Sequence, residues 1–486
     1  MGVAPMYLGI DVGTSGVKAV VIDELGDTVA HGAAALRVSR PRDLWSEQNP
    51  DDWWDATTAA VGHIDPELRH DVRAIGLAGQ MHGATLLGSD DRPLRPAILW
   101  NDGRSFAECR ELESLVPEMH AITGNLAMPG FTAPKLIWVR RHEPALFAAT
   151  RTVLLPKDYV RLHLTGDRAS DCSDSAGTLW LDAEHRRWSE QMLAACGLGL
   201  SHMPALHEGT EPTGLLRIAV ADSWGMRTVP VIAGGGDNAA GAVGAGVVRK
   251  DDALLSLGAS GVIFVATDAF RPNPRDAVHA FCHCLPGMWH QMAVHLSAAA
   301  CIDWVARVTG DRGPAKVFAR AEVTGPAAGK ELFLPYLSGE RTPHNDAHVR
   351  GAFLNLDHET DAGRLAEAVL EGVAFALADG LDALSAAGSR IERLSVIGGG
   401  TRSSYWGRLI AATLGVPLDY VRGGELGPAL GAARLARSAV EHGDPTDVFT
   451  RPPLAHVVEP DAALARCLAE KRHRFRAAYP LLRAMH

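Results

Sequence analysis

Residues 9–16 read Gly9-Ile10-Asp11-Val12-Gly13-Thr14-Ser15-Gly16 and lie between two apolar runs. Apolar runs around a short Gly, Ser and Thr segment predict a β-hairpin, here over residues 7–23. A shift of 245 positions places residues 11–17 over residues 256–262, where Gly258-Ala259-Ser260-Gly261 repeats the glycine pattern. The shift is far too long for a solenoid repeat. The sequence therefore predicts two similar domains, joined near residues 245–255.

A second, less exact pairing supports the duplication. Residues 231–238 and 396–403 each continue an apolar run into consecutive glycines, and we interpret them as equivalent segments. Asn49, followed by a proline and two acids, predicts a helix start, and apolar spacing predicts a second helix over residues 365–377. Strands alternating with helices favour an α/β fold, with domains at residues 1–248 and 249–486.

Composition and charge exclude several classes of protein. The 486 residues are 47% apolar and 21% charged, which is typical of a globular protein of two or more domains. A net charge of −10 disfavours a nucleic-acid partner. We find no secretory signal and no apolar run that could span a membrane. The seven cysteines are thinly spread, which indicates a reducing compartment, and we expect a cytoplasmic protein.

The first hairpin is a candidate phosphate site. Glycine lets backbone N–H groups approach a phosphate closely, and Thr14 and Ser15 add hydroxyl donors. Asp11 would be repelled by those phosphates unless a cation lay between them, so it is a candidate Mg²⁺ partner through water. The alternative is a plain hairpin in which Asp11 caps the turn. The chain has neither a Gly-x-x-x-x-Gly-Lys-Ser/Thr loop nor a protein-kinase His-Arg-Asp signature.

Three further motifs carry polar groups. Gly234-Gly235-Gly236-Asp237-Asn238 follows an apolar strand, and Asp237 there is a general base, a metal ligand or a helix N-cap. Met81 and His82 also follow an apolar run, although a lone histidine is usually structural. Asn101 and Asp102 stand beside a tryptophan, a combination suited to a sugar, with an ordinary turn as the alternative.

One cluster resembles a metal site. Cys282-His283-Cys284 has three more histidines nearby, but its spacing matches no usual zinc pattern. Side chains at i and i+2 of a strand share one face. We therefore predict that Cys282 and Cys284 pack in a core.

The chain resembles the FGGY family of carbohydrate kinases over nearly its whole length. The motifs that carry the resemblance are Gly9–Gly16, Trp45-Ser46-Glu47-Gln48, Gly79-Gln80-Met81-His82-Gly83, Trp100-Asn101-Asp102-Gly103-Arg104, Pro156-Lys157-Asp158-Tyr159, Gly234–Asn238, Gly339-Glu340-Arg341-Thr342-Pro343 and Gly398-Gly399-Gly400. The motifs at 80–83 and 100–103 narrow the resemblance to the branch of the family that phosphorylates D-xylulose.

The resemblance implies an actin-like ATPase fold, in which two ribonuclease-H-like domains flank a cleft that holds sugar and ATP. It implies that Asp237 is the catalytic base and that Asp11 serves a Mg²⁺ that accompanies ATP. The implied sugar-binding residues are Met81, His82, Asn238, Asn101 and Asp102. The implied ATP-binding residues are Thr14, Ser15, Gly16, Gly258, Ala259, Gly399 and Ser403.

Ala259 departs from the family pattern, because this second hairpin usually carries Thr at that position. We expect a lower affinity for ATP rather than a loss of activity. The expected partners are small molecules, a sugar and ATP, with no nucleic acid and no membrane. The sequence leaves open whether the protein forms a homodimer. The alternatives are a kinase for another ketopentose or polyol, and an actin- or chaperone-like ATPase without a sugar substrate.

Overall fold

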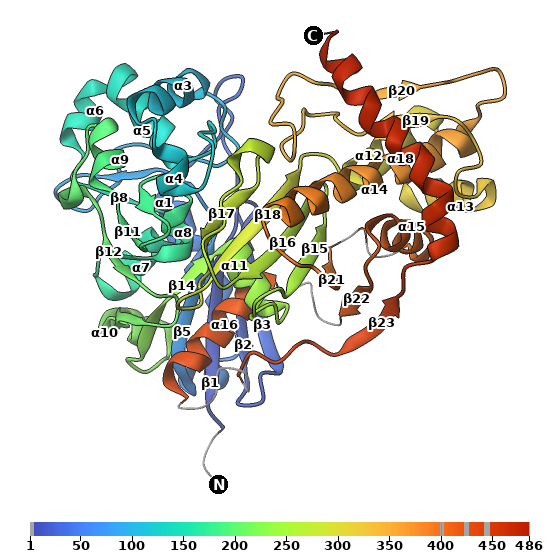
Figure 1. The fold of residues 1–486 in the computed structure, drawn as a ribbon. Coiled ribbons are helices and arrows are strands. Elements are labelled where there is room, and N and C mark those ends of the chain that lie inside the picture. The colour runs from blue at the N-terminus through green and yellow to red at the C-terminus, as the bar shows by residue number, and fades with distance from the viewer. Residues whose placement is uncertain (1–3, 399, 401–402, 422–426, 442–447, 486) are drawn as a thin grey trace.

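The computed structural model describes residues 4–398, 400, 403–421, 427–441 and 448–485. Two mixed sheets organise the chain and lie side by side in Figure 1. The first has the order β13 (Pro212–Leu215), β14 (Pro230–Gly236), β5 (Val72–Gly79), β1 (Met6–Val12), β2 (Gly16–Ile22) and β3 (Thr28–Ala35). The second has the order β17 (His279–Cys282), β18 (Trp289–His295), β16 (Gly261–Thr267), β15 (Ala253–Leu257), β21 (Leu394–Ile397), β22 (Leu418–Val421) and β23 (Leu454–Val458).

Helices cover these sheets. In the first half they are α1 (Pro50–Gly62), α2 (Pro66–His70), α3 (Phe106–Leu115), α4 (Met119–Thr123), α5 (Thr132–His142), α6 (Pro144–Ala149), α7 (Pro156–Thr165), α8 (Cys172–Ala176), α9 (Glu190–Ala195), η1 (Leu200–His202), α10 (Ile218–Trp224) and α11 (Asp237–Gly244). In the second half they are η2 (Pro274–Asp276), α12 (Ala299–Thr309), α13 (Pro314–Thr324), α14 (Ala362–Ala386), α15 (Ser404–Leu414), α16 (Gly427–Val440) and α18 (Ala462–Arg483).

Among the described residues, five two-stranded ladders complete the fold. They pair β4 (Glu47–Gln48) with β7 (Ala97–Ile98), β6 (Thr85–Leu87) with β8 (Thr152–Leu154), β9 (Ala169–Asp171) with β12 (Ala205–His207), β10 (Leu181–Asp182) with β11 (Arg187–Trp188), and β19 (Leu332–Leu334) with β20 (Ala352–Leu354). No described helix is long and apolar enough to cross a membrane.

The local predictions are confirmed. Residues 7–23 include the antiparallel pair β1 and β2, and the matching pair β15 and β16 lies at the centre of the second sheet. Asn49 is the N-cap of α1, where its side chain accepts the Asp51 N–H. The apolar spacing at 365–377 lies within α14, most of which is buried between neighbouring elements.

The second pairing of glycine segments is wrong as an equivalence. β21 lies directly beside β15, so its counterpart in the first sheet is β5, which lies directly beside β1; β14 is one strand further out. The two segments look alike because each needs a glycine near the end of its strand, within β14 in one case and directly after β21 in the other. Gly234 and Gly398 have φ of 76° and 101°, and a Cβ at either would approach the carbonyl oxygen of the neighbouring strand (Leu77 and Leu257) too closely.

Two features join the halves. A hydrophobic cluster includes Leu86 and Trp180 from the first half with Phe281 and Met292 from the second. The helix α16 comes late in the chain, yet it packs against β1, β5 and α11, among the elements of the first half (Figure 1). The boundary at residue 248 stays a prediction.

Candidate active site

Asp11 is the penultimate residue of the buried strand β1, close to the turn at residues 13–16. Its side chain is buried, and its Oδ1 atom has no hydrogen-bond partner among the described residues. Burial raises the pKa of Asp11 to about 7, and the nearby charge of Asp237 adds to that rise. A buried carboxylate oxygen that has no partner among the described residues and that feels the charge of a second carboxylate fits a hard cation such as Mg²⁺.

Asp237 lies where β14 passes into α11. Gly236 occupies the N-cap position and Asp237 is the first residue of the helix, so the N-cap alternative for Asp237 is wrong. Its Oδ1 atom accepts hydrogen bonds from Asn238 N (2.8 Å) and Asn238 Nδ2 (2.9 Å), and Oδ2 receives none from the described residues. Burial raises the pKa of Asp237 to about 6. The carboxylate is thus held by one oxygen while the other is available to a proton.

Met81 and His82 follow β5, beside this junction. A Cβ on Gly236 would lie 2.9 Å from Met81 Cγ, so the methionine packs directly against the turn that precedes Asp237. His82 has φ of 70°, a left-handed conformation that is uncommon outside glycine. Its Nδ1 lies 2.6 Å from the carbonyl oxygen of Gly177.

His82 presents a hydrogen-bond acceptor. Burial lowers the pKa of His82 to about 3, so the imidazole is neutral. Because Nδ1 faces a carbonyl oxygen, it carries the proton, and Nε2 keeps its lone pair for a hydroxyl group. The ring packs edge-on against Phe131 at 4.6 Å and also contacts Phe281 of β17. The site is therefore bounded by both halves of the chain.

The sequence did not single out the residues that hold His82 in place. Its carbonyl oxygen accepts hydrogen bonds from Lys135 Nζ (2.8 Å) and Thr132 Oγ1 (3.1 Å). Lys135 is fully buried, and burial lowers its pKa well below the ordinary value. In the sequence, the one sign of this role is that Lys135 stands among apolar residues of the segment that forms α5.

Asn101 and Asp102 differ in what they offer a ligand. The Asn101 Oδ1 atom is buried without a partner among the described residues. The Asp102 carboxylate instead accepts from Ser46 N at 2.6 Å and from Arg104 Nη2 at 2.7 Å. The Asp102 carboxylate thus already has hydrogen-bond partners within the protein.

In the first hairpin, the Thr14 hydroxyl already has hydrogen-bond partners within the protein. Thr14 Oγ1 donates to Gln80 Oε1 and accepts from the Trp100 indole N–H, both at 2.9 Å. Ser15 is exposed, and Gly16 begins β2. The Gly13 N–H donates to the Gly16 carbonyl oxygen at 3.1 Å. The Ser15 hydroxyl and the N–H groups of residues 14–16, which have no hydrogen-bond partner among the described residues, are therefore the donors left for a ligand.

The second hairpin faces outward at Gly258 and Ala259. The carbonyl oxygen of Ala259 accepts from Ala298 N at 2.8 Å, which ties the turn to the start of α12. Ser403 is the N-cap of α15, and its Oγ accepts from Trp406 N at 3.2 Å. Gly399 lies outside the described residues.

Cys282 and Cys284 pack in a core, as predicted, and both are fully buried. Burial lowers the pKa of His283 to about 3. Within the described part of the chain, no group of three or more His, Cys, Asp or Glu side chains could hold a metal ion. A pocket of about 610 Å³ lies between the halves and is lined from both, for example by Met128 and Arg341, but not by the predicted site residues.

Comparisons with known proteins agree on one family. The profile of the N-terminal domain of the FGGY family of carbohydrate kinases matches residues 6–244, and that of the C-terminal domain matches residues 253–440. The xylulose kinase of Escherichia coli (strain K12) is 53% identical over 98% of this chain and 99% of its own length. That of Klebsiella pneumoniae is 51% identical over 99% and 100%.

Solved structures show the same fold. The crystal structure of a xyloylose kinase from Brucella ovis is 50% identical, with a TM-score of 0.96 over 99% of this chain and 100% of that chain. A xylulose kinase from Rhodospirillum rubrum, 28% identical, has a TM-score of 0.91 over 99% of both chains. The predicted α/β fold of the actin-like ATPase type is confirmed.

Proposed function

Since the chain belongs to the FGGY family of carbohydrate kinases, we propose that it transfers the terminal phosphoryl group of ATP to D-xylulose, giving D-xylulose 5-phosphate. The observation that carries this proposal is identity above 50% to two xylulose kinases over almost the full length of all three chains. The reaction needs a base, a sugar pocket and a phosphate site, and the chain has candidate residues for each.

Asp237 is the proposed base. Phosphoryl transfer passes through a loose transition state, so positioning and charge neutralisation matter more than a strong base. A pKa of about 6 nevertheless brings Asp237 closer to neutral pH than an ordinary aspartate, which favours proton transfer. Asn238 holds Oδ1, and we assign Oδ2 to the proton of the terminal sugar hydroxyl.

The sugar would bind between β5, β14 and the loop at residues 100–104. His82 Nε2 would accept a hydrogen bond from a sugar hydroxyl, and Met81 would supply an apolar wall. Asn238 would add polar contacts, and so would Asn101, whose Oδ1 atom has no partner among the described residues. Asp102, whose oxygens are taken by Ser46 and Arg104, would fix this loop.

The nucleotide phosphates would lie between the two hairpins. Ser15 and the backbone of Thr14 and Gly16 would serve one side, and Gly258 and Ala259 the other. Ser403, at the N-terminus of the 11-residue helix α15, would lie on the nucleotide side of the second sheet. Asp11, whose Oδ1 is unpaired among the described residues, would hold Mg²⁺. Bound Mg²⁺ neutralises charge on the phosphate oxygens.

A substrate panel tests the proposal. D-xylulose, D-ribulose, L-ribulose and glycerol are each supplied with Mg²⁺ and ATP, and ADP release is followed by a coupled assay; a reaction without sugar measures plain ATP hydrolysis. We expect the highest kcat/KM with D-xylulose. A higher kcat/KM with another acceptor would refute the substrate, and ADP release that no sugar increases would refute the kinase activity.

A further inference from the structure

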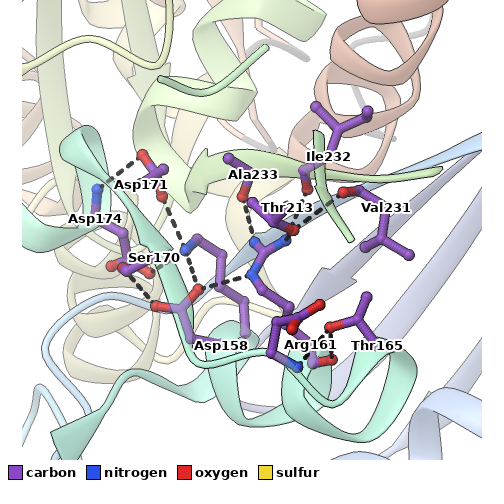
Figure 2. Close-up of polar contacts among 12 residues, drawn as sticks. Asp158, Arg161, Thr165, Ser170, Asp171, Asp174, Thr213, Val231, Ile232 and Ala233 are labelled. Carbon is purple, nitrogen blue, oxygen red and sulfur yellow. Dashed lines mark hydrogen bonds and ion pairs between the residues drawn. The ribbon is translucent and has the colours of Figure 1, made fainter. Parts of the chain in front are cut away.

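A buried ionic cluster lies beside β14, the strand that ends immediately before Asp237. Its members, fully buried and contributed by α7, β9 and α8, are Lys157, Asp158, Arg161, Asp171 and Asp174. In Figure 2, Asp158, Asp171 and Asp174 lie beside β14, and Arg161 lies between them and the strand. Lys157 Nζ lies 2.6 Å from Asp158 Oδ1 and 2.8 Å from Asp171 Oδ1. Burying so many charges costs free energy that pairing only partly restores, so the cluster is a poor device for stability alone.

Arg161 links the cluster to β14. Its guanidinium donates to the carbonyl oxygens of Ile232 (3.0 Å) and Ala233 (2.5 Å), as Figure 2 shows. The pairing of β14 with β5 shifts register between Ile232 and Gly235. Arg161 therefore binds the strand where its regular ladder is interrupted.

Ser173 extends this support to the residue that precedes the proposed base. Asp171 Oδ2 accepts from Ser173 N (2.7 Å) and Ser173 Oγ (2.5 Å). Because the hydroxyl gives its only proton to Asp171, it turns a lone pair toward Gly236, whose N–H it accepts at 3.1 Å. Lys157 holds the other oxygen of Asp171, so a continuous path runs from the cluster to the Gly236–Asp237 junction.

We propose that Ser173 is a positioning residue for Asp237: anchored by Asp171 and Lys157, its hydroxyl fixes the Gly236 N–H and so the direction of the carboxylate. This inference rests on the proposed function. Loss of the hydroxyl leaves a buried N–H without its acceptor and frees the junction to move. A shift of about 1 Å in a reacting group costs about 10²-fold in rate.

The test compares Ser173→Ala with Ser175→Ala in the full-length enzyme. Ser175 is a matched control, since it is fully buried on the same helix and, among the described residues, its hydroxyl donates to Ser170 Oγ at 2.9 Å and makes no hydrogen bond to β14. We expect Ser173→Ala to lower kcat about 10- to 100-fold relative to Ser175→Ala, with KM for D-xylulose and ATP within about twofold. Ser173→Thr, which keeps the hydroxyl, should restore part of kcat.

Two further variants keep the result decisive. If Ser173 acts through Asp237, then adding Ser173→Ala to Asp237→Asn lowers kcat no further, whereas a general structural role would make the losses add. Where Ser173→Ala does not fold, Ser173→Cys keeps the shape with a weak acceptor and is read in the same way. Equal kcat for the Ser173 and Ser175 variants, or a rise in KM alone, would overturn the inference. A wild-type enzyme that phosphorylates no sugar would instead refute the proposed function.

Discussion

Replacing Asp237 with asparagine tests the proposed base directly. In the wild-type site Oδ1 accepts both hydrogen bonds from Asn238, and Oδ2 is not bonded by the described residues. An asparagine can accept both bonds with its own Oδ1 and keep the side-chain orientation. Its Nδ2 then stands where Oδ2 stood, without a lone pair for a proton. The variant changes the chemistry of one atom and little else.

The expected loss is confined to the chemical step. General-base catalysis contributes about 10²–10⁴ in rate, so kcat of Asp237→Asn should fall by that factor, about 3–5 kcal/mol in activation free energy. KM for ATP should change little. The Asp237 charge also helps to raise the pKa of Asp11. Since the variant removes that repulsion, its melting temperature near neutral pH should not fall below that of the wild type.

The assay measures kcat and KM by coupled ADP release, with melting temperature as a control for folding. Asp11→Asn is the matched variant, because it neutralises the other member of the same carboxylate pair. A higher Mg²⁺ concentration should restore part of the kcat that Asp11→Asn loses. It should not restore the kcat that Asp237→Asn loses. If Asp237→Asn kept more than about a tenth of wild-type kcat, Asp237 would not be the general base.

Other variants probe the nucleotide site, the C-terminal half and the packing of the sheet. Ala259→Thr adds a hydroxyl at the second hairpin and should lower KM for ATP about two- to tenfold at unchanged melting temperature; an unchanged KM would place Ala259 away from the nucleotide. Burial raises the pKa of Glu367 to about 8, so the folded state holds a proton that the unfolded state releases above about 4.5, and stability falls as pH rises between those values. Glu367→Gln should therefore raise the melting temperature more at about pH 8.5 than at about pH 5; an equal effect at both would refute the shift. A Cβ on Gly76 would lie 1.9 Å from the Ala432 carbonyl oxygen of α16, so Gly76→Ala should destabilise the protein by about 1–3 kcal/mol in denaturant unfolding. Gly62→Ala, with no atom within 4 Å of its new Cβ, should not, and equal losses would contradict the close packing of α16.

The sequence by itself determined the local elements and the chemistry they carry. Apolar runs around Gly13-Thr14-Ser15-Gly16 predicted the hairpin, and Asn49 with Pro50 predicted the start of α1. Both depend on backbone preferences of neighbouring residues, which act over a few positions and are visible in a single chain. For Asp237 the sequence predicted a polar group after a glycine-rich strand end, and the structure places this residue at the start of α11, directly after β14.

Only the tertiary structure decided which distant groups meet. The sequence paired β14 with β21, whereas the sheet orders make β5 the counterpart of β21. It did not show that the Asp102 carboxylate accepts hydrogen bonds from Ser46 and Arg104, and sugar binding by Asp102 stays a prediction. It gave no sign that Ser173 reaches the backbone that precedes Asp237. A buried carboxylate or hydroxyl can be satisfied by many partners of the same chemistry, and which one it finds depends on the packing of the whole chain.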